Sequence, residues 1–208
     1  SFEIMKNNGL YQGTRWQYRW AAPQFLDKMI AWVGKDTLCA QLSYFFDHHL
    51  YNQGNEPDIH VPYIFNRLGA PEKTQKLVRS LMTEPMIHKY GGNAEFKTPY
   101  FGKAFKNHPV GYSPEMDEDD GTMSAWYVFG ALGFYPMVVG DEYYELTSPL
   151  FDSITLRLEN GNKLSIQVQG RKQKNMPIQS VSFNGREVKD YRISHNELIK
   201  GGKLVFNY

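Results

Sequence analysis

The sequence predicts a mainly α-helical region at residues 1–140, followed by a small antiparallel β region at residues 141–208. Apolar residues recur every three or four positions in the first two thirds of the chain and alternate every second position in the last third. The chain has 208 residues, of which 41% are apolar and 15% aromatic. It can therefore bury a sizeable core.

Three helices are expected in the first region. One follows Asp36, a candidate N-cap, and a second begins at Pro71 just after Gly69, a candidate C-cap residue. A third begins near Thr122 and ends at Gly133. Their patterns of helical spacing are expected to contain Leu38, Leu42, Phe45, Phe46, His49, Leu77, Val78, Leu81, Met82, Met123, Trp126 and Tyr127.

The segment at residues 90–121, between the second and third helices, is rich in Gly, Pro, Asn and Tyr. Loops of this length are uncommon in compact domains unless they are functional. In the β region, the alternating runs at 154–158 and 164–168 flank Asn160-Gly161, and Asn184-Gly185 follows another run. Such dipeptides adopt the positive φ values of tight turns, so two hairpins are expected.

The charge balance excludes several classes of partner. The 23 basic and 22 acidic residues leave a net charge of +1, which gives no excess field to attract nucleic acid or an anionic membrane. No apolar stretch is long enough to span a membrane. The single cysteine, Cys39, excludes an internal disulfide and a cysteine-based zinc site. The sequence does not determine localisation. Secretion or display at the cell surface would require an export signal upstream of residue 1.

Four consecutive carboxylates, from Asp117 to Asp120, precede the third helix. If this segment is extended, Asp117 and Asp119 point to the same side, where a pair can hold and deprotonate one water molecule. The alternative is a solvated acidic loop that supplies negative charge to a helix N-terminus.

Two further segments could contact a ligand. The loop around Asn55, Glu56 and Asp58 combines a turn with hard oxygen ligands that suit calcium or sugar hydroxyls, although any loop uses these residues. Trp16 and Trp20 lie among amide and guanidinium groups. Such a cluster suits a sugar-binding wall, and a packing role in the core is equally compatible with it.

Taken together, these segments resemble glycoside hydrolase family 92, the inverting, calcium-dependent exo-α-mannosidases. The resemblance runs in order along nearly the whole chain. It rests on YQGTRWQYRW at 11–20, GNEP at 54–57, PYIFN at 62–66, TQK at 74–76, DEDDGTMSAWY at 117–127, GFYP at 133–136, SPLF at 148–151 and the ending at 194–206.

The resemblance implies a larger enzyme, in which an N-terminal β-sandwich precedes an (α/α)6 barrel and the active site lies between them. Residues 1–140 would be the C-terminal part of that barrel, and residues 141–208 a closing β segment. The rest of the parent enzyme chain would then be a partner of this chain, and mannose-containing glycans its substrates. On its own, the 208-residue chain is expected to be inactive.

The resemblance also implies roles for individual residues. Asp119 would be the base and Asp117 its partner, Glu56 and Asp119 would lie near calcium, and Asn55, Glu56, Trp16 and Gln75 would contact substrate. The family's acid is a glutamate, and here that position is Gln12. The family's neighbouring Pro-His/Gln-Asp pattern reads Pro-Gln-Phe at 23–25.

An amide cannot donate a proton as a carboxylic acid does, but a phosphate leaving group departs as a stable anion without one. Family members with glutamine at this position resemble enzymes that remove mannose from mannose-1-phospho-6-mannose caps. The expected function is therefore hydrolysis of such diesters, with Gln12 donating a hydrogen bond to the leaving group. The alternatives are a catalytically dead mannose-binding protein, or an ordinary α-1,2-mannosidase carrying an engineered Gln12.

Overall fold

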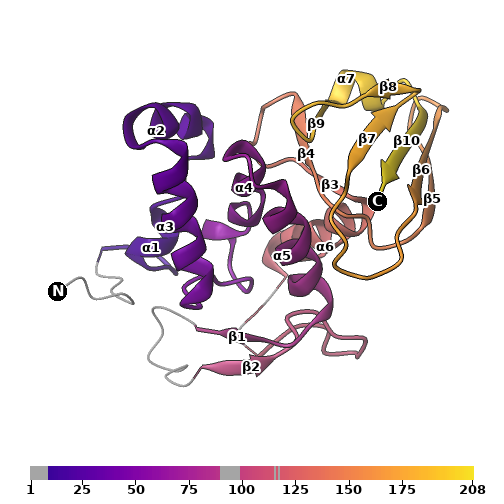
Figure 1. Ribbon diagram of the computed structural model, residues 1–208. Coiled ribbons are helices and arrows are strands. Elements are labelled where there is room, and N and C mark those ends of the chain that lie inside the picture. Colours follow the sequence, from indigo (N-terminus) through magenta and orange to yellow (C-terminus); the bar gives the residue numbers. More distant parts are fainter. Residues whose placement is uncertain (1–8, 90–98, 115, 117) are drawn as a thin grey trace. The chain divides into compact units, whose positions relative to one another are not determined.

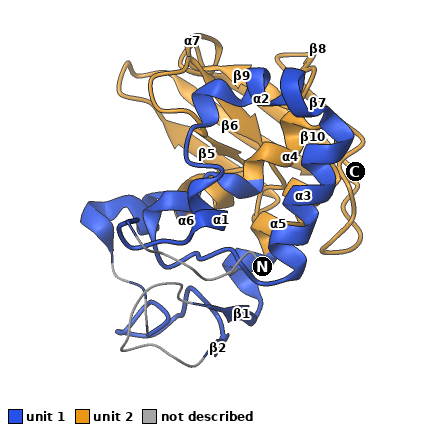
Figure 2. Ribbon diagram, turned by 90° about the vertical axis from the view of Figure 1, so that its left-hand side faces the viewer, with its two compact units in different colours: residues 1–62, 80–126 blue, residues 63–79, 127–208 orange. Residues whose placement is uncertain are grey.

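The computed structural model of the chain describes residues 9–89, 99–114, 116 and 118–208. Contacts divide the chain into two compact units, which Figure 2 colours separately. Unit 1 consists of residues 1–62 and 80–126, and unit 2 consists of residues 63–79 and 127–208. The helices α5 (Pro71–Thr83) and α6 (Thr122–Leu132) each run from one unit into the other.

Unit 1 is mainly helical, with one small hairpin (Figure 1). The hairpin pairs β1 (Met86–His88) with β2 (Tyr100–Gly102) in antiparallel register, with Ile87 opposite Phe101. The helical elements that begin in this unit, apart from α6, are α1 (Arg15–Tyr18), η1 (Pro23–Phe25), α2 (Leu26–Val33), α3 (Lys35–Asp47), η2 (Glu56–Asp58), η3 (Val61–Tyr63) and η4 (Asp119–Gly121).

The helix expected after Asp36 begins two residues earlier than expected, at Lys35. Its N-cap is Gly34, with φ 89° and ψ 144°, so the expected N-cap at Asp36 was wrong. Glycine adopts this backbone conformation readily, and the chain turns there directly from α2 into α3. Asp36 instead lies in the first turn of α3, where its negative charge interacts favourably with the positive end of the helix dipole.

The core of unit 1 contains part of the predicted pattern of α3, whereas Phe46 is half-buried and His49 lies beyond the end of this helix at Asp47. Leu38, Leu42 and Phe45 are fully buried, and the ring of Trp20 lies 6.4 Å from that of Phe45. Trp20 is 1% exposed, so it has the packing role. Its carbonyl oxygen lies 2.7 Å from Nε2 of His60.

The expected boundaries of α5 and α6 are confirmed. The helix α5 begins at Pro71 after Gly69, which has φ 80°, and Val78, Leu81 and Met82 are buried on it. The helix α6 begins at Thr122, buries Met123 and Trp126 completely, and is followed by Gly133 with φ 93°. A Cβ at Gly133 would lie 2.6 Å from Cγ of Pro149, so both its backbone conformation and its surroundings require glycine.

Besides its parts of α5 and α6, unit 2 contains two sheets and two short helices. A five-stranded sheet has the order β5-β6-β10-β7-β8, and a three-stranded sheet has the order β3-β4-β9. The elements are α4 (Ile64–Arg67), β3 (Phe134–Tyr135), β4 (Tyr143–Leu146), β5 (Ser153–Arg157), β6 (Lys163–Gln169), β7 (Ser180–Phe183), β8 (Arg186–Glu187), β9 (Arg192–Ser194), α7 (His195–Leu198) and β10 (Gly202–Asn207).

The two predicted hairpins are present, but the larger sheet is not purely antiparallel. Ile154 pairs with Ile166 across the first hairpin, and Asn184 and Gly185, with φ 50° and 80°, form the turn of the second. The strand β10 pairs in parallel with β6, which corrects the expectation of an antiparallel region. The long connection between β6 and β10, which contains β7, β8, β9 and α7, allows the chain to return in the same direction.

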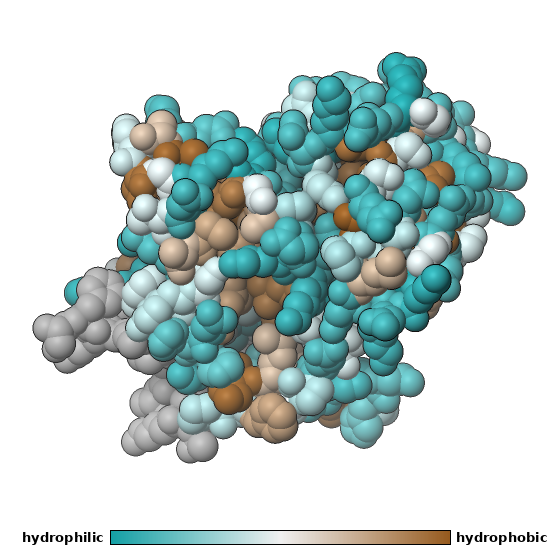
Figure 3. All heavy atoms as spheres, viewed as in Figure 1, coloured by the Kyte–Doolittle hydropathy of each residue, from teal (hydrophilic) through white to brown (hydrophobic). Residues whose placement is uncertain are grey.

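The inward faces of the strands form the core of unit 2, which includes Leu164, Ile166, Leu204 and Phe206. On the face shown in Figure 3, hydrophilic side chains predominate and apolar ones form small separate groups, one of them over α2. Among the described residues, no helix has both the length and the apolar character needed to cross a membrane.

Candidate active site

The turn at η2 is joined to the N-terminal half of α6 within unit 1. Nε1 of Trp126 donates a hydrogen bond to the carbonyl oxygen of Ile59 at 2.8 Å, and the Trp126 ring stacks on Phe105 with a centroid distance of 5.8 Å. One turn earlier on α6, Oγ1 of Thr122 donates to Oε1 of Glu56 at 3.1 Å. A buried ring and a hydroxyl group therefore fix Glu56 beside the start of α6.

Asn55 extends this connection to Gln12. Its Oδ1 accepts the backbone N–H of Glu56 at 2.9 Å, which caps η2, and its Nδ2 donates to the carbonyl oxygen of Gln12. Gln12, Asn55, Glu56 and Thr122 are thus linked in one chain of hydrogen bonds. Three of these residues, Gln12, Asn55 and Glu56, were predicted site residues. The fold brings the Asn55-Glu56 pair to Gln12, which lies 43 positions before Asn55 in the sequence.

Asp119 lies on a strained turn immediately before α6. Asp119 and Asp120 have φ values of 45° and 55°, and Gly121 follows with φ 95°. Two consecutive non-glycine residues in the left-handed region are unfavourable, and such conformations cluster at functional sites. The Asp119 side chain is half-buried and that of Asp120 is exposed. Asp117 lies outside the described residues.

Glu118 holds this turn against α6. Its Oε1 accepts the backbone N–H of Ser124 at 3.2 Å, and its Oε2 accepts the Ser124 hydroxyl at 2.9 Å. The same hydroxyl lies 2.6 Å from the hydroxyl of Tyr112. In the alternative interpretation, the acidic run as a whole supplies negative charge to this helix N-terminus, whereas the contact is made by Glu118. The signal was a carboxylate followed closely by serine at a helix start.

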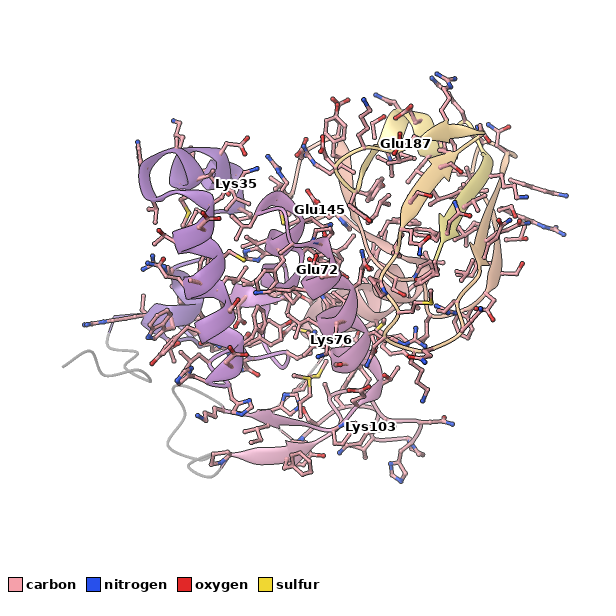
Figure 4. All side chains as sticks on the ribbon, in the orientation of Figure 1. Lys35, Glu72, Lys76, Lys103, Glu145 and Glu187 are labelled. Carbon is pink, nitrogen blue, oxygen red and sulfur yellow. The ribbon has the colours of Figure 1, made fainter. Side chains whose placement is uncertain are left out.

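Trp16 and Gln75 each contact other residues of the protein. Trp16, on α1, is half-buried and stacks on Tyr44 at a centroid distance of 5.4 Å. Gln75 lies in unit 2, on α5 between Glu72 and Lys76, which are labelled in Figure 4. It is 4% exposed, and its Oε1 accepts the backbone N–H of Ile178 at 2.9 Å. Substrate contacts by Trp16 and Gln75 remain predictions.

Asp58 is a buried carboxyl group, although its loop suggested an exposed ligand. It is completely buried, and its Oδ2 accepts the backbone N–H of Asn52 at 3.0 Å. Burial raises the pKa of Asp58 well above its ordinary value, with the hydrogen bond from Asn52 opposing the shift. Burial also lowers the pKa of His60, opposed by its contact with the carbonyl oxygen of Trp20. Asp58 is the last residue of η2 and His60 follows two residues later, so the contacts of both groups help to fix this turn.

Unit 2 contains a second buried carboxyl group, Glu145 on β4 (Figure 4). Its Oε1 lies 3.0 Å from Nε of Arg192 and 3.9 Å from Nη1 of Arg67, and its Oε2 accepts Nδ2 of Asn66 at 3.2 Å. Burial raises the pKa of Glu145 to about 7, despite the opposing effect of Arg192, Asn66 and Arg67. Desolvation therefore outweighs the attraction of the two guanidinium groups.

The two predicted calcium ligands both offer carboxylate oxygens, the ligand type that calcium prefers. Calcium takes roughly six to eight oxygen ligands. Across residues 9–89, 99–114, 116 and 118–208, no group of three or more His, Cys, Asp or Glu side chains could hold a metal ion. Glu56 and Asp119 therefore fit, at most, as part of a calcium site.

The family model for the glycosyl hydrolase family 92 catalytic domain matches residues 1–208 of this chain. The chain belongs to glycosyl hydrolase family 92. The solved structure of the family 92 enzyme ccman5 is 29% identical, with a TM-score of 0.89, and the match covers 100% of this chain and 30% of that one.

Other family 92 structures are similar. The α-mannosidase BT3965 from Bacteroides thetaiotaomicron is 27% identical, with a TM-score of 0.77 over 95% of this chain and 25% of that one. The inverting mannosidase BT2199 from Bacteroides thetaiotaomicron VPI-5482 is 26% identical, with a TM-score of 0.75 over 95% of this chain and 27% of that one.

A secreted glycosidase from Arthroderma benhamiae, described as uncharacterized, is 22% identical over 198 residues. That match covers 93% of this chain and 23% of the relative. The chain thus spans less than a third of the length of each of these relatives.

Proposed function

We propose that the complete protein is an inverting exo-α-mannosidase that hydrolyses mannose-α-1-phosphodiesters. The observation that carries this proposal is the hydrogen-bonded chain from Gln12 through Asn55 and Glu56 to Thr122, which begins the helix that follows Asp119. It connects the proposed leaving-group residue to the helix start beside the proposed base. Membership of family 92, and the mannosidases among its similar structures, support the class of reaction.

In the proposed mechanism, Asp119 takes a proton from a water molecule as the water attacks the anomeric carbon of mannose. Asp117 holds that water. Inversion requires water to enter on the face opposite the leaving group, with the two catalytic groups roughly 6.5 to 9.5 Å apart. The strained turn at 119–121 stabilises one orientation of the Asp119 carboxylate before substrate arrives.

Gln12 determines which leaving group can depart. Its side chain is exposed, while Asn55 holds its main-chain carbonyl. A sugar alkoxide needs a proton from an acid, which contributes about 10² to 10⁴-fold to the rate, and an amide cannot supply it. A phosphate group leaves as an anion, and glutamine can donate a hydrogen bond to it without the repulsion that a carboxylate would add.

We also propose that the remainder of a longer parent chain completes the site. The chain spans 25% to 30% of three similar structures. Around α2, Phe25, Trp32 and Val33 are 50%, 81% and 38% exposed. Such a group of large apolar side chains is suited to contact with other barrel helices of the parent. Residues 1–140 would then form the later part of an (α/α)6 barrel, and the 208-residue chain alone would have little activity.

The experiment compares kcat/KM for wild type and Gln12→Glu in the complete protein, on a mannose-α-1-phosphodiester and on α-1,2-mannobiose. Wild type should prefer the diester. Gln12→Glu should improve mannobiose cleavage by up to about 10² to 10⁴-fold, because the restored acid protonates the alkoxide. It should weaken diester cleavage through repulsion between the two anions.

Gln173→Glu, the same change at an exposed position of unit 2, serves as the control and should change neither activity. A wild type that prefers mannobiose would contradict the diester proposal. A protein that binds mannose but cleaves neither substrate would instead be a mannose-binding protein.

A further inference from the structure

Unit 2 has a hollow outside the proposed active site. It lies between the β7–β8 hairpin, the segment that leads into β9, and α7 with the residues after it. Figure 4 labels Glu187 on this hairpin. The cavity volume is about 390 Å³, within the range of roughly 300 to 1,000 Å³ typical of small-molecule sites. All lining residues belong to unit 2, which the structure describes completely.

The floor of this hollow is apolar and fixed by the core. Phe183 and Ile193 line it, are 8% and 2% exposed, and pack in the core of unit 2, while Val188 packs against that core. One edge is held by Asn184, whose Oδ1 accepts the backbone N–H of Lys203 at 2.7 Å and whose Nδ2 donates to the carbonyl oxygen of Gly201 at 3.3 Å. The hollow is therefore largely formed before any ligand binds.

The rim carries a surplus of positive charge. Arg186, Lys189, Arg192 and Lys200 line the hollow together with two carboxylates, Glu187 and Glu197, which leaves a surplus of two positive charges. This exceeds the net charge of +1 on the whole chain. The local excess favours an anionic ligand.

The rim cations differ in how they are engaged. Arg192 pairs with Asp141 at 3.1 Å and with Glu145 at 3.0 Å, so it is committed to the protein. No ion pair joins the Arg186, Lys189 or Lys200 side chain to any of the described residues. Glu197 accepts the hydroxyl of Ser194 at 3.3 Å. Three cations, one more than the two rim carboxylates, thus remain available to an anion at the mouth of the hollow.

We propose that this hollow binds a saccharide that carries a phosphate group. The apolar floor suits the apolar face of a sugar ring, and Arg186, Lys189 and Lys200 suit a group that bears about two negative charges. A glycan is the expected class of ligand because the chain belongs to a glycoside hydrolase family. The site is formed by residues other than the proposed catalytic ones, and it does not depend on which bond the enzyme cleaves.

The test measures binding rather than turnover, so its outcome is separable from that of the proposed function. Titration calorimetry on the complete protein at low salt compares mannose 6-phosphate, mannose and inorganic phosphate. Mannose 6-phosphate should bind more tightly than either of the others, because only it meets both the floor and the rim.

The double variant Arg186→Gln/Lys189→Gln should weaken mannose 6-phosphate binding by at least about tenfold. The control Arg157→Gln/Lys172→Gln removes two exposed cations of unit 2 outside the hollow and should leave binding unchanged. The circular dichroism spectra and melting temperatures of both double variants should match those of wild type, which checks that they fold.

Three results would overturn the proposal. The first is the absence of measurable mannose 6-phosphate binding to wild type. The second is inorganic phosphate binding as tightly as the sugar phosphate, which would reveal a simple anion site. The third is equal affinity in the two double variants, which would place the ligand elsewhere.

Discussion

Glu118 accepts two hydrogen bonds from Ser124, one from the backbone N–H at 3.2 Å and one from the hydroxyl at 2.9 Å. This pairing fastens the acidic turn to the first turn of α6. Since Asp119 follows Glu118 directly, the orientation of the proposed base depends on a neighbouring residue that need not touch substrate.

Removal of the two hydrogen bonds between Glu118 and Ser124 should affect both the stability of the protein and the rate of the reaction. Glu118→Ala should lower the free energy of unfolding by about 1 kcal/mol, as loss of a helix cap does. It should also lower kcat more than it raises KM, because Asp119 loses its fixed orientation. Steady-state kinetics and urea unfolding of the complete protein would test both effects.

Glu84 provides a matched control, since it accepts the Ser80 hydroxyl at 2.9 Å at the exposed end of α5. Glu84→Ala should leave kcat unchanged. An equal loss of kcat in the two variants would argue against a specific role for Glu118.

Asp119 and Asp120 allow the base to be identified by a paired substitution. Both have left-handed backbones, a conformation that asparagine adopts at least as readily as aspartate, so neither Asn variant should unfold. Asp119→Asn should abolish cleavage of every substrate, because each needs an activated water. Asp120→Asn should retain activity, because its side chain is exposed. The opposite pattern would assign the base to Asp120.

Glu145 should make stability depend on pH. Its pKa is raised to about 7 by burial, above its value of about 4.3 in the unfolded chain. The folded protein therefore binds an extra proton between these values. The resulting stabilisation is complete below about pH 4 and is lost as the pH rises through 7, with a total on the order of 3 kcal/mol.

This effect can be isolated by comparison with Glu145→Gln, which cannot titrate. The unfolding free energy of wild type minus that of the variant should fall between pH 5 and pH 8. Glu142→Gln, at an exposed position just before β4, is the control for the substitution itself. A difference that rises with pH in Glu145→Gln would mean that the two guanidinium groups dominate over burial.

Calcium should support activity of the complete protein, with Glu56 among its oxygen ligands. Exhaustive chelation should remove activity, and added calcium should restore it. Glu56→Gln should raise the calcium concentration needed for half-maximal activity, since one anionic ligand is lost. Chelated enzyme that keeps full activity would remove calcium from the mechanism.

The sequence was most informative where local signals decide the structure. Pro71 and Gly133 mark helix boundaries by their backbone preferences alone, and Asn184-Gly185 predicts its hairpin for the same reason. The parallel pairing of β6 with β10 could not be predicted, because it depends on how a long connection returns.

Within the candidate site, the resemblance led to Gln12, Asn55, Glu56 and Asp119, and the first three prove to be linked by hydrogen bonds. The contacts that support them were missed. The hydrogen bond from Trp126 to Ile59 and the complete burial of Asp58 depend on contacts between segments that are distant in the sequence. No local sequence pattern predicts such contacts. Thr122 was predicted only as a helix start, although its hydroxyl contacts Glu56.

Nδ2 of Asn55 donates its hydrogen bond to the main-chain carbonyl oxygen of Gln12 and not to the Gln12 side chain. The same hydrogen bond can therefore form whether glutamine or glutamate occupies that position. A single substitution there can exchange an acid for an amide without disturbing the surrounding framework. Evolution could in this way redirect such an enzyme from one leaving group to another in one step, and a protein engineer could reverse that step as simply.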